Sequence, residues 1–371
     1  MLSKGNSSSA SGSVCYVTGG AGFIGCALSH ELVSRFDQVI AIDCMHPQVH
    51  ASASRPDALH AGVKLVVADV TKPETWKKLL AERAPDTVVH LAAETGTGQS
   101  LLEGSRHAHV NVLGTTVMLD AFARHDRIPK RIVLASSRAV YGEGAWHSGD
   151  HRQAIYPGQR TRAQLDKKVW DFPGLRPLPF SATTTMANPV SIYGATKLAQ
   201  EHIMSAWCHS LGVTCAVLRL QNVYGPGQSL KNPYTGICSY FAQLAKAGRA
   251  IPLYEDGQIV RDFVYVEDVV DAILAATASP LSEMTPFDIG CGRPTTIAEL
   301  AALFAEIYDA PEPVVTEQFR HGDVRHASCS IHRAQAGLSW APKTILADGI
   351  SRLCTWTDGQ KRLRLLRDTA A

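Results

Sequence analysis

One short segment restricts the possible folds of this chain more than any other feature. Residues 18–25 read TGGAGFIG and lie between an apolar run at 14–18 and a helical pattern through Leu28, Leu32 and Val33. A glycine turn between a buried strand and a helix lets the backbone approach a pyrophosphate, whose oxygens face the N–H groups of the helix start. Asp43 follows about 20 residues later, where a carboxylate binds a ribose 2′-hydroxyl. This arrangement predicts a dinucleotide site and favours NAD over NADP.

The rest of the chain extends this unit into a larger fold. Strand-like apolar runs separated by helical patterns lie at 14–18, 39–43, 64–67, 87–91, 131–136 and 215–220. Such alternation predicts a Rossmann-type doubly wound parallel α/β sheet. We expect a flexible tail at 1–13, an NAD-binding domain at 14–222 and a smaller C-terminal α/β substrate-binding domain at 223–371. Residues 264–280 are expected to return to the first domain.

Residues 143–187 interrupt the regular pattern. They are rich in Pro, Gly, Arg and His and contain no clear strand. Long irregular segments inside α/β domains are either functional or disordered. We therefore expect either a lid or wall beside the active site or a mobile surface insertion.

Composition excludes several classes of function. Lys and Arg (36) nearly balance Asp and Glu (34), which argues against nucleic acid as a partner. No apolar run reaches the length of a membrane span, and the N-terminal residues lack the apolar core of a signal peptide. The nine cysteines form no CxxC pair and the histidines are dispersed, so neither a disulfide framework nor a metal site is expected. These features favour a cytoplasmic protein.

A second group of residues predicts acid–base chemistry. Tyr193 and Lys197 are four residues apart and share one face of a helix. A cation beside a phenol lowers the pKa of the phenol, so that Tyr193 can remove a hydroxyl proton. Ser136 and Ser137 end the fifth strand-like run, and ligands bind at the carboxyl ends of strands in such sheets.

These motifs together resemble the extended short-chain dehydrogenase/reductase family, from Val14 to about Trp340. The resemblance is to its nucleotide-sugar epimerase/dehydratase branch and implies a catalytic triad of Ser137, Tyr193 and Lys197. It also implies a homodimer that pairs through helices near 105–124 and 193–211. The cofactor-binding residues that it implies are Gly19, Gly22, Phe23, Ile24, Gly25, Asp43, Asp69, Val70, Leu91, Ala92, Ala93, Asn111, Ser136, Tyr193 and Lys197.

The second half resembles the nucleotide-sugar enzymes in three arginine- and asparagine-bearing segments, at 218–226, 257–263 and 320–325. Guanidinium groups make bidentate, permanently charged contacts with phosphate. The substrate-binding residues that the resemblance implies are Thr97, Ser137, Arg138, Asn222, Leu253, Tyr254, Arg261, Arg320 and Arg325.

Residues 136–142, SSRAVYG, favour one reaction within this branch. The related 4,6-dehydratases carry an Asp-Glu pair where this chain has Arg138 and Ala139, and neither residue can supply acid or base for elimination of water. The resemblance therefore implies 4-epimerisation through a transient 4-keto sugar. Segments 94–100 and 228–236 resemble the enzymes that act on dTDP-L-rhamnose. A UDP-glucose or UDP-GlcNAc 4-epimerase, an NADH-dependent 4-keto-sugar reductase and a non-catalytic NAD-binding protein remain as alternatives.

Overall fold

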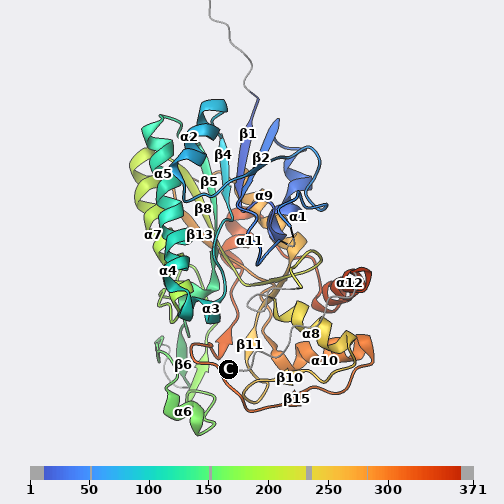
Figure 1. Cartoon of the computed structure of the whole chain (residues 1–371). Coiled ribbons are helices and arrows are strands. Elements are labelled where there is room, and N and C mark those ends of the chain that lie inside the picture. Colours follow the sequence, from blue (N-terminus) through green and yellow to red (C-terminus); the bar gives the residue numbers. More distant parts are fainter. Residues whose placement is uncertain (1–11, 51, 150–152, 231–235, 282, 361–371) are drawn as a thin grey trace, which may run out of the picture.

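The computed structural model describes residues 12–50, 52–149, 153–230, 236–281 and 283–360, so most of the expected tail at 1–13 lies outside it. The described part is built on a seven-stranded sheet of order β13-β8-β5-β4-β1-β2-β3, in which every neighbouring pair is parallel (Figure 1). The predicted Rossmann-type sheet is confirmed. Its strands are β1 (Val14–Thr18), β2 (Gln38–Asp43), β3 (Lys64–Val67), β4 (Thr87–His90), β5 (Arg131–Ser137), β8 (Thr214–Leu220) and β13 (Thr285–Ile289).

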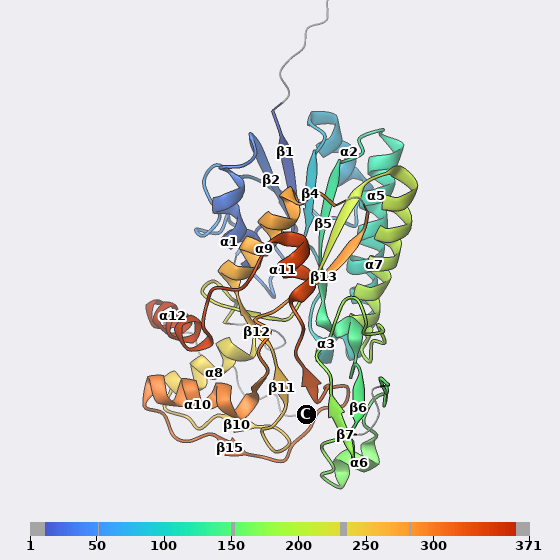
Figure 2. The ribbon, with the colours of Figure 1, turned by 180° about the vertical axis from the view of Figure 1, so that it is seen from behind.

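Helices cover both faces of this sheet, as the two opposite views show (Figure 2). One face carries α1 (Phe23–Leu32), α9 (Val266–Ala278) and α11 (His332–Leu338). The other carries α2 (Pro73–Glu82), α5 (Gly114–Arg124) and α7 (Ile192–Leu211). Two short helices, α3 (Thr97–Leu102) and α4 (Gly104–His107), precede a π-helical stretch, η1 (Ala108–Leu113), that runs into α5. The π-helical turn is wider than an α-helical turn, and such turns often mark functional sites.

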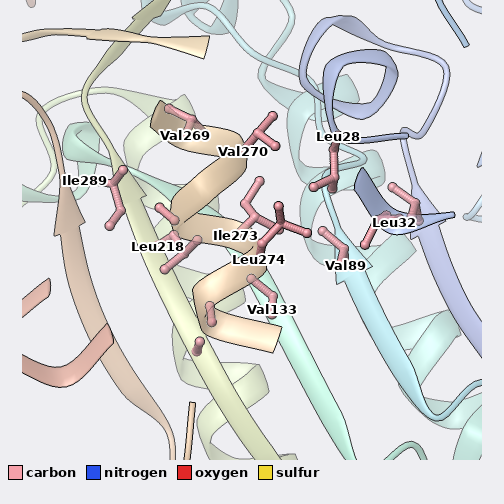
Figure 3. Packing of buried hydrophobic residues seen from close by; sticks show 14 of the residues in the cluster. Leu28, Leu32, Val89, Val133, Leu218, Val269, Val270, Ile273, Leu274 and Ile289 are labelled. Carbon is pink, nitrogen blue, oxygen red and sulfur yellow. The ribbon is translucent and has the colours of Figure 1, made fainter. Parts of the chain in front are cut away.

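The packing of α9 explains why a late segment returns to the sheet. Val270, Ile273 and Leu274 face Leu28 of α1 and the apolar side chains of the central strands (Figure 3). Burying an aliphatic side chain of this size contributes about 1.5–3 kcal/mol, so this apolar face holds α9 on the sheet. The sheet then gains β13, and α11 packs beside it. Both elements lie beyond the predicted return at 264–280.

A second core lies below the carboxyl ends of the strands (Figure 1). Its helices are α8 (Ile237–Lys246), α10 (Ile297–Tyr308) and α12 (Leu346–Gly359). Its short strands form three small sheets: β9 (Asn222–Tyr224) with β12 (Phe263–Tyr265), β10 (Pro252–Leu253) with β15 (Val314–Val315), and β11 (Val260–Arg261) between β14 (Thr295–Thr296) and β16 (His326–Ala327). None of the helices among the described residues is long and apolar enough to span a membrane.

Segment 143–187 differs from the sequence expectation. It contains β6 (Trp146–Ser148) paired antiparallel with β7 (Leu175–Pro177), and the short helix α6 (Arg162–Asp166). Two of its aromatic residues pack against each other: the ring centroids of Trp146 and Phe172 lie 4.9 Å apart, with the rings edge to face. The strands are only three residues long, which is too short for a period-2 pattern to be recognised in the sequence.

Candidate active site

The glycine turn after β1 is shaped for close backbone contact. Gly19 has φ +66°, and a Cβ there would lie 2.8 Å from the backbone nitrogen of Ala92. A Cβ on Gly20 would lie 2.7 Å from the Ala41 methyl, and one on Gly25 would lie 2.5 Å from the carbonyl oxygen of Gly20. Side chains at these positions would push the turn away from the strands, so the glycines keep the turn close against the carboxyl edge of the sheet.

The same turn leads into α1, whose N-cap residue Gly22 makes no side-chain capping bond. Glycine has no side chain with which to cap the first N–H groups of α1, starting with Phe23 and Ile24. These groups face the space where phosphate oxygens bind in such folds. Asp43 ends β2 and is nearly buried; its carboxylate accepts from the N–H groups of Ala21 (3.1 Å) and Met45 (2.9 Å). The glycine cradle, uncapped helix and carboxylate fit NAD, with the phosphates at α1 and the adenosine ribose at Asp43.

We expect Asp43→Asn to weaken the preference for NAD over NADP by about tenfold, because the carboxylate repels a 2′-phosphate and makes charge-assisted bonds to a 2′-hydroxyl. Titration calorimetry with both dinucleotides measures the ratio of their dissociation constants. Asp57→Asn, which changes an exposed carboxylate of the same region, serves as the control. An unchanged ratio in Asp43→Asn would contradict the assigned role.

The other predicted cofactor residues line the same edge. Leu91, Ala92 and Ala93 follow β4, and the backbone of Ala92 packs against the glycine turn. Asp69 and Val70 follow β3, where the Asp69 carboxylate accepts from the N–H of Thr71 at 2.8 Å. The buried Asn111 lies in η1, where its amide donates to the Thr196 hydroxyl at 2.9 Å and to the carbonyl of Glu94 at 3.0 Å.

The structure brings the three predicted catalytic residues to one place. Ser137 ends β5, while Tyr193 and Lys197 lie on the first turns of α7, which packs against β5. The hydroxyl of Ser137 lies next to the phenol of Tyr193 and acts to lower the pKa of that phenol. The ammonium of Lys197 is buried and donates to the amide oxygen of Gln200. Ser136 instead points toward α7, where it donates to the carboxylate of Glu201.

The electrostatics of this group differ from the sequence expectation. Burial raises the pKa of Tyr193, and the hydrogen bond from Ser137 and the positive charge of Arg138 offset this only in part. Burial also lowers the pKa of Lys197 to about 7, against the opposing effect of Glu201. The phenol of Tyr193 is therefore neutral near pH 7 in these surroundings. Lowering its pKa requires the positive charges around it, including that of a bound oxidised nicotinamide.

Two guanidinium groups meet beside the phenol. Arg138, in the 3₁₀ turn η2 (Arg138–Tyr141), donates through Nε to the amide oxygen of Asn222 at 2.8 Å. Burial and the neighbouring charge of Arg261 lower the pKa of Arg138 to about 9. Arg261 is buried, and its nearest carboxylate is Asp323 at 3.8 Å. Two close, desolvated cations of this kind favour an anion between them.

The remaining predicted substrate residues have other surroundings. Arg320 is exposed and lies 4.8 Å above the ring of Tyr254. Leu253 is buried in the second core, and Thr97 begins α3. Arg325 has a different role from the one that the sequence predicts. Its guanidinium donates to the carboxylates of Asp171, Glu255 and Asp256 at 2.7–3.3 Å, so its charge is compensated within the chain.

Sequence reasoning missed the residues that hold the insertion in position. Arg160 donates to Glu255 at 2.8 Å and lies 3.6 Å from the carboxylate of Glu143. Arg325 joins this group from the C-terminal part through Glu255 at 3.0 Å. All four side chains are at most 4% exposed. Nothing in the local sequence marks Glu143, Arg160 or Glu255, since the partners are far apart along the chain, and the sequence pointed to Arg325 only as a substrate-binding residue.

The buried cluster predicts a pH-dependent stability. Burial raises the pKa of Glu143 to about 7, with Arg160 opposing the shift. The native state then binds the proton of Glu143 more tightly than the unfolded chain does. This proton stabilises the native state fully below pH 4.5, and the stabilisation is lost as the pH rises through 7. Glu143→Gln removes this titration. Between pH 4.5 and pH 7 the unfolding free energy of the variant should fall by up to about 3 kcal/mol less than that of the unmodified protein.

Urea unfolding at a series of pH values from 4.5 to 8 measures this effect. Glu312→Gln, at an exposed position, should keep the slope of the unmodified protein. A Glu143→Gln variant with that same slope shows that Glu143 does not titrate as the buried geometry requires.

Comparisons with known proteins agree with this geometry. The model of the NAD dependent epimerase/dehydratase family matches residues 15–162 and 172–290. The chain belongs to this family. Its membership makes NAD the cofactor of this protein.

Curated relatives match over almost the whole chain. A dTDP-L-rhamnose 4-epimerase of Burkholderia thailandensis is 52% identical over 355 residues, which are 96% of this chain and 98% of the relative. A UDP-glucose 4-epimerase of Mycolicibacterium smegmatis is 30% identical over 91% of this chain and 96% of the relative. The chain therefore aligns with these two sugar-nucleotide epimerases over 96% and 91% of its length.

Solved structures share the fold. The UDP-glucose 4-epimerase of Thermotoga maritima, solved with UDP-glucose, is 28% identical with a TM-score of 0.76 over 93% of this chain and 98% of that one. The UDP-glucose 4-epimerase of Thermus thermophilus, solved with NAD, is 27% identical with a TM-score of 0.74, over 93% of this chain and 99% of that one.

Proposed function

We propose that this protein is an NAD-dependent nucleotide-sugar 4-epimerase that acts on a dTDP-6-deoxyhexose such as dTDP-L-rhamnose. The observation that carries the reaction is the place of Tyr193, on α7 against the end of β5, next to Ser137 and Arg138, with Arg261 close to Arg138. The choice of substrate is supported by the 52% identity with the Burkholderia enzyme.

In this proposal the residues divide the work. Arg138 and Arg261 bind the diphosphate and so bring the hexose to the end of β5. Tyr193 takes the proton of the C4 hydroxyl and later returns it, and Ser137 orients that hydroxyl. Lys197 supplies positive charge behind the phenol and a bond to the nicotinamide ribose. NAD, when bound, supplies the hydride acceptor and donor for C4.

The same site disfavours elimination of water. That reaction needs an acid and a base on either side of the leaving group. Within the stretch that links Ser137 to Tyr141, the positions in question are Arg138, which is engaged with Asn222, and Ala139. Neither side chain can exchange a proton near neutral pH, so the 4-keto sugar is reduced again and released as the epimer.

NMR of the purified protein with dTDP-L-rhamnose, without added cofactor, tests the proposal. Appearance of the C4 epimer supports it. UDP-glucose and UDP-GlcNAc in parallel samples test the alternative that a UDP-sugar is the substrate. The Mycolicibacterium relative is named a UDP-glucose 4-epimerase. Consumption of NADH with a 4-keto sugar, without epimerisation, would establish a reductase. A protein that binds NAD and converts none of these sugars would be a non-catalytic member.

We also propose a cytoplasmic homodimer. All nine cysteines are free, and seven of them are buried, which suits a reducing compartment. Large apolar side chains are exposed on the flank formed by α3, η1 and α7, among them Leu102, Leu113 and Ile192. Apolar side chains grouped on one flank are typical of an interface between subunits. Light scattering on the purified protein measures its mass, and a monomeric mass would contradict the dimer.

A further inference from the structure

We infer that the side-chain amide of Gln221 binds a ring hydroxyl of the hexose and thereby helps to select the sugar. This inference rests on the proposed function and concerns the same site. Gln221 follows the last residue of β8 and precedes Asn222, which holds Arg138.

The amide of Gln221 is buried without a partner. The side chain is 5% exposed, and neither its Oε1 nor its Nε2 has a hydrogen-bond partner among the described residues. A buried, unpaired donor and acceptor carry a free-energy penalty that an apolar side chain of the same size avoids. A polar side chain kept at such a position calls for an explanation, and contact with a bound ligand is one that the location supports.

The strand register gives the direction of this side chain. The N–H of Gln221 donates to the carbonyl of Ile289 at 2.9 Å, so the residue continues the ladder between β8 and β13. Side chains alternate along a strand. Leu218 and Leu220 pack with α9, whereas Arg219 binds Glu201 of α7. Gln221 is two residues after Arg219, so its side chain lies on the same face of the sheet. That face is covered by α7, the helix that carries Tyr193.

The position along the site also fits the hexose. Leu220 pairs with Ser137 across the sheet, so Gln221 lies one residue beyond the level of the reacting hydroxyl. On its other side, Asn222 and Arg138 mark the diphosphate position. The hexose of a nucleotide sugar spans the distance between these two points. A primary amide donates and accepts, and a sugar hydroxyl does the same, so the two groups are complementary.

Gln221→Met tests the inference, because methionine keeps the length of the side chain and removes its hydrogen bonds. We expect kcat/KM for dTDP-L-rhamnose to fall about 10-fold or more, because the sugar hydroxyl loses its partner. We expect the affinity for dTDP, which has no sugar at the diphosphate, to change less than about twofold. The NAD content of the purified protein should stay the same. The melting temperature should stay the same or rise, since an unpaired amide leaves the interior.

Gln243→Met is the matched control. Gln243 lies in α8, and its amide donates to the carbonyls of Leu230 and Ser239 at 3.0 and 3.1 Å. Its loss should lower the melting temperature and leave the ratio of affinities for dTDP-L-rhamnose and dTDP unchanged.

Two results overturn the inference. One is an unchanged ratio of those affinities in Gln221→Met, and the other is a loss of bound NAD, which would assign the amide to the nicotinamide. Calorimetry with UDP-glucose and UDP separates this inference from the proposed function. If the unmodified protein binds UDP-glucose but does not convert dTDP-L-rhamnose, the proposed substrate is wrong. The amide is then tested by the affinity ratio of UDP-glucose to UDP, which Gln221→Met must lower.

Discussion

Replacement of Tyr193 by phenylalanine is expected to lower kcat for epimerisation about 10²- to 10⁴-fold, the range of a single positioned acid–base group. The change deletes only the hydroxyl that lies next to Ser137. The ring still packs at 6.3 Å from the imidazole of His107, so the position of α7 should not change. The effect should therefore fall on kcat and leave nucleotide binding unaltered.

Single-turnover NMR with dTDP-L-rhamnose, with the NAD content measured on the same sample, checks this expectation. Tyr308→Phe is the control, because it deletes a phenol that bonds to Cys354 and Asp358, in the second core and away from the site. Its kcat should match that of the unmodified protein. A Tyr193→Phe variant that keeps more than about a tenth of the activity would remove Tyr193 from the proton transfer.

The largest expected loss of stability follows from Arg160→Met. The guanidinium of Arg160 bonds to Glu255 and neighbours Glu143 in a space that excludes water. Removing one member of a buried ionic group leaves the opposite charges uncompensated, which costs about 3–5 kcal/mol. Methionine fills most of the vacated volume, so the loss arises mainly from charge and not from a cavity.

Urea unfolding at pH 7.5 measures this loss. Arg162→Met, two residues along the chain, removes an exposed guanidinium paired with Asp166 and should change stability by less than about 0.5 kcal/mol. Equal, small effects of both variants would show that 143–187 is a loosely held surface insertion. A large effect of Arg160→Met alone would favour a wall fixed beside the site.

Residues close together in sequence carried the parts of the site that could be predicted. The glycine turn at 19–25 and the pair of Tyr193 and Lys197 depend on spacing within one turn or one helix, and the structure brings them to the expected edge. Strands β1 to β5 and β8 were also predictable, because buried parallel strands form continuous apolar runs. Their functional roles stay predictions until the variants are measured.

Other features could not be predicted, because they depend on partners distant in sequence. Arg325 resembles a phosphate ligand in its segment, yet it is bound by Asp171, 154 residues away. Arg160 pairs with Glu255 across 95 residues. A charged residue has the same appearance in the sequence whether its neighbour in the fold is water, a phosphate or a carboxylate.

The sequence by itself determined the class of sheet, and it predicted the cofactor turn and the acid–base residues, because each rests on local periodicity or spacing. Only the tertiary structure decided which arginines remain for the diphosphate, how the insertion is held, and that Gln221 is buried without a partner. Burial also reversed the expected direction of the Tyr193 pKa. The physical reason is the same in each case: desolvation and charge compensation are set by every group that surrounds a side chain, and the chain brings those groups together only when it folds.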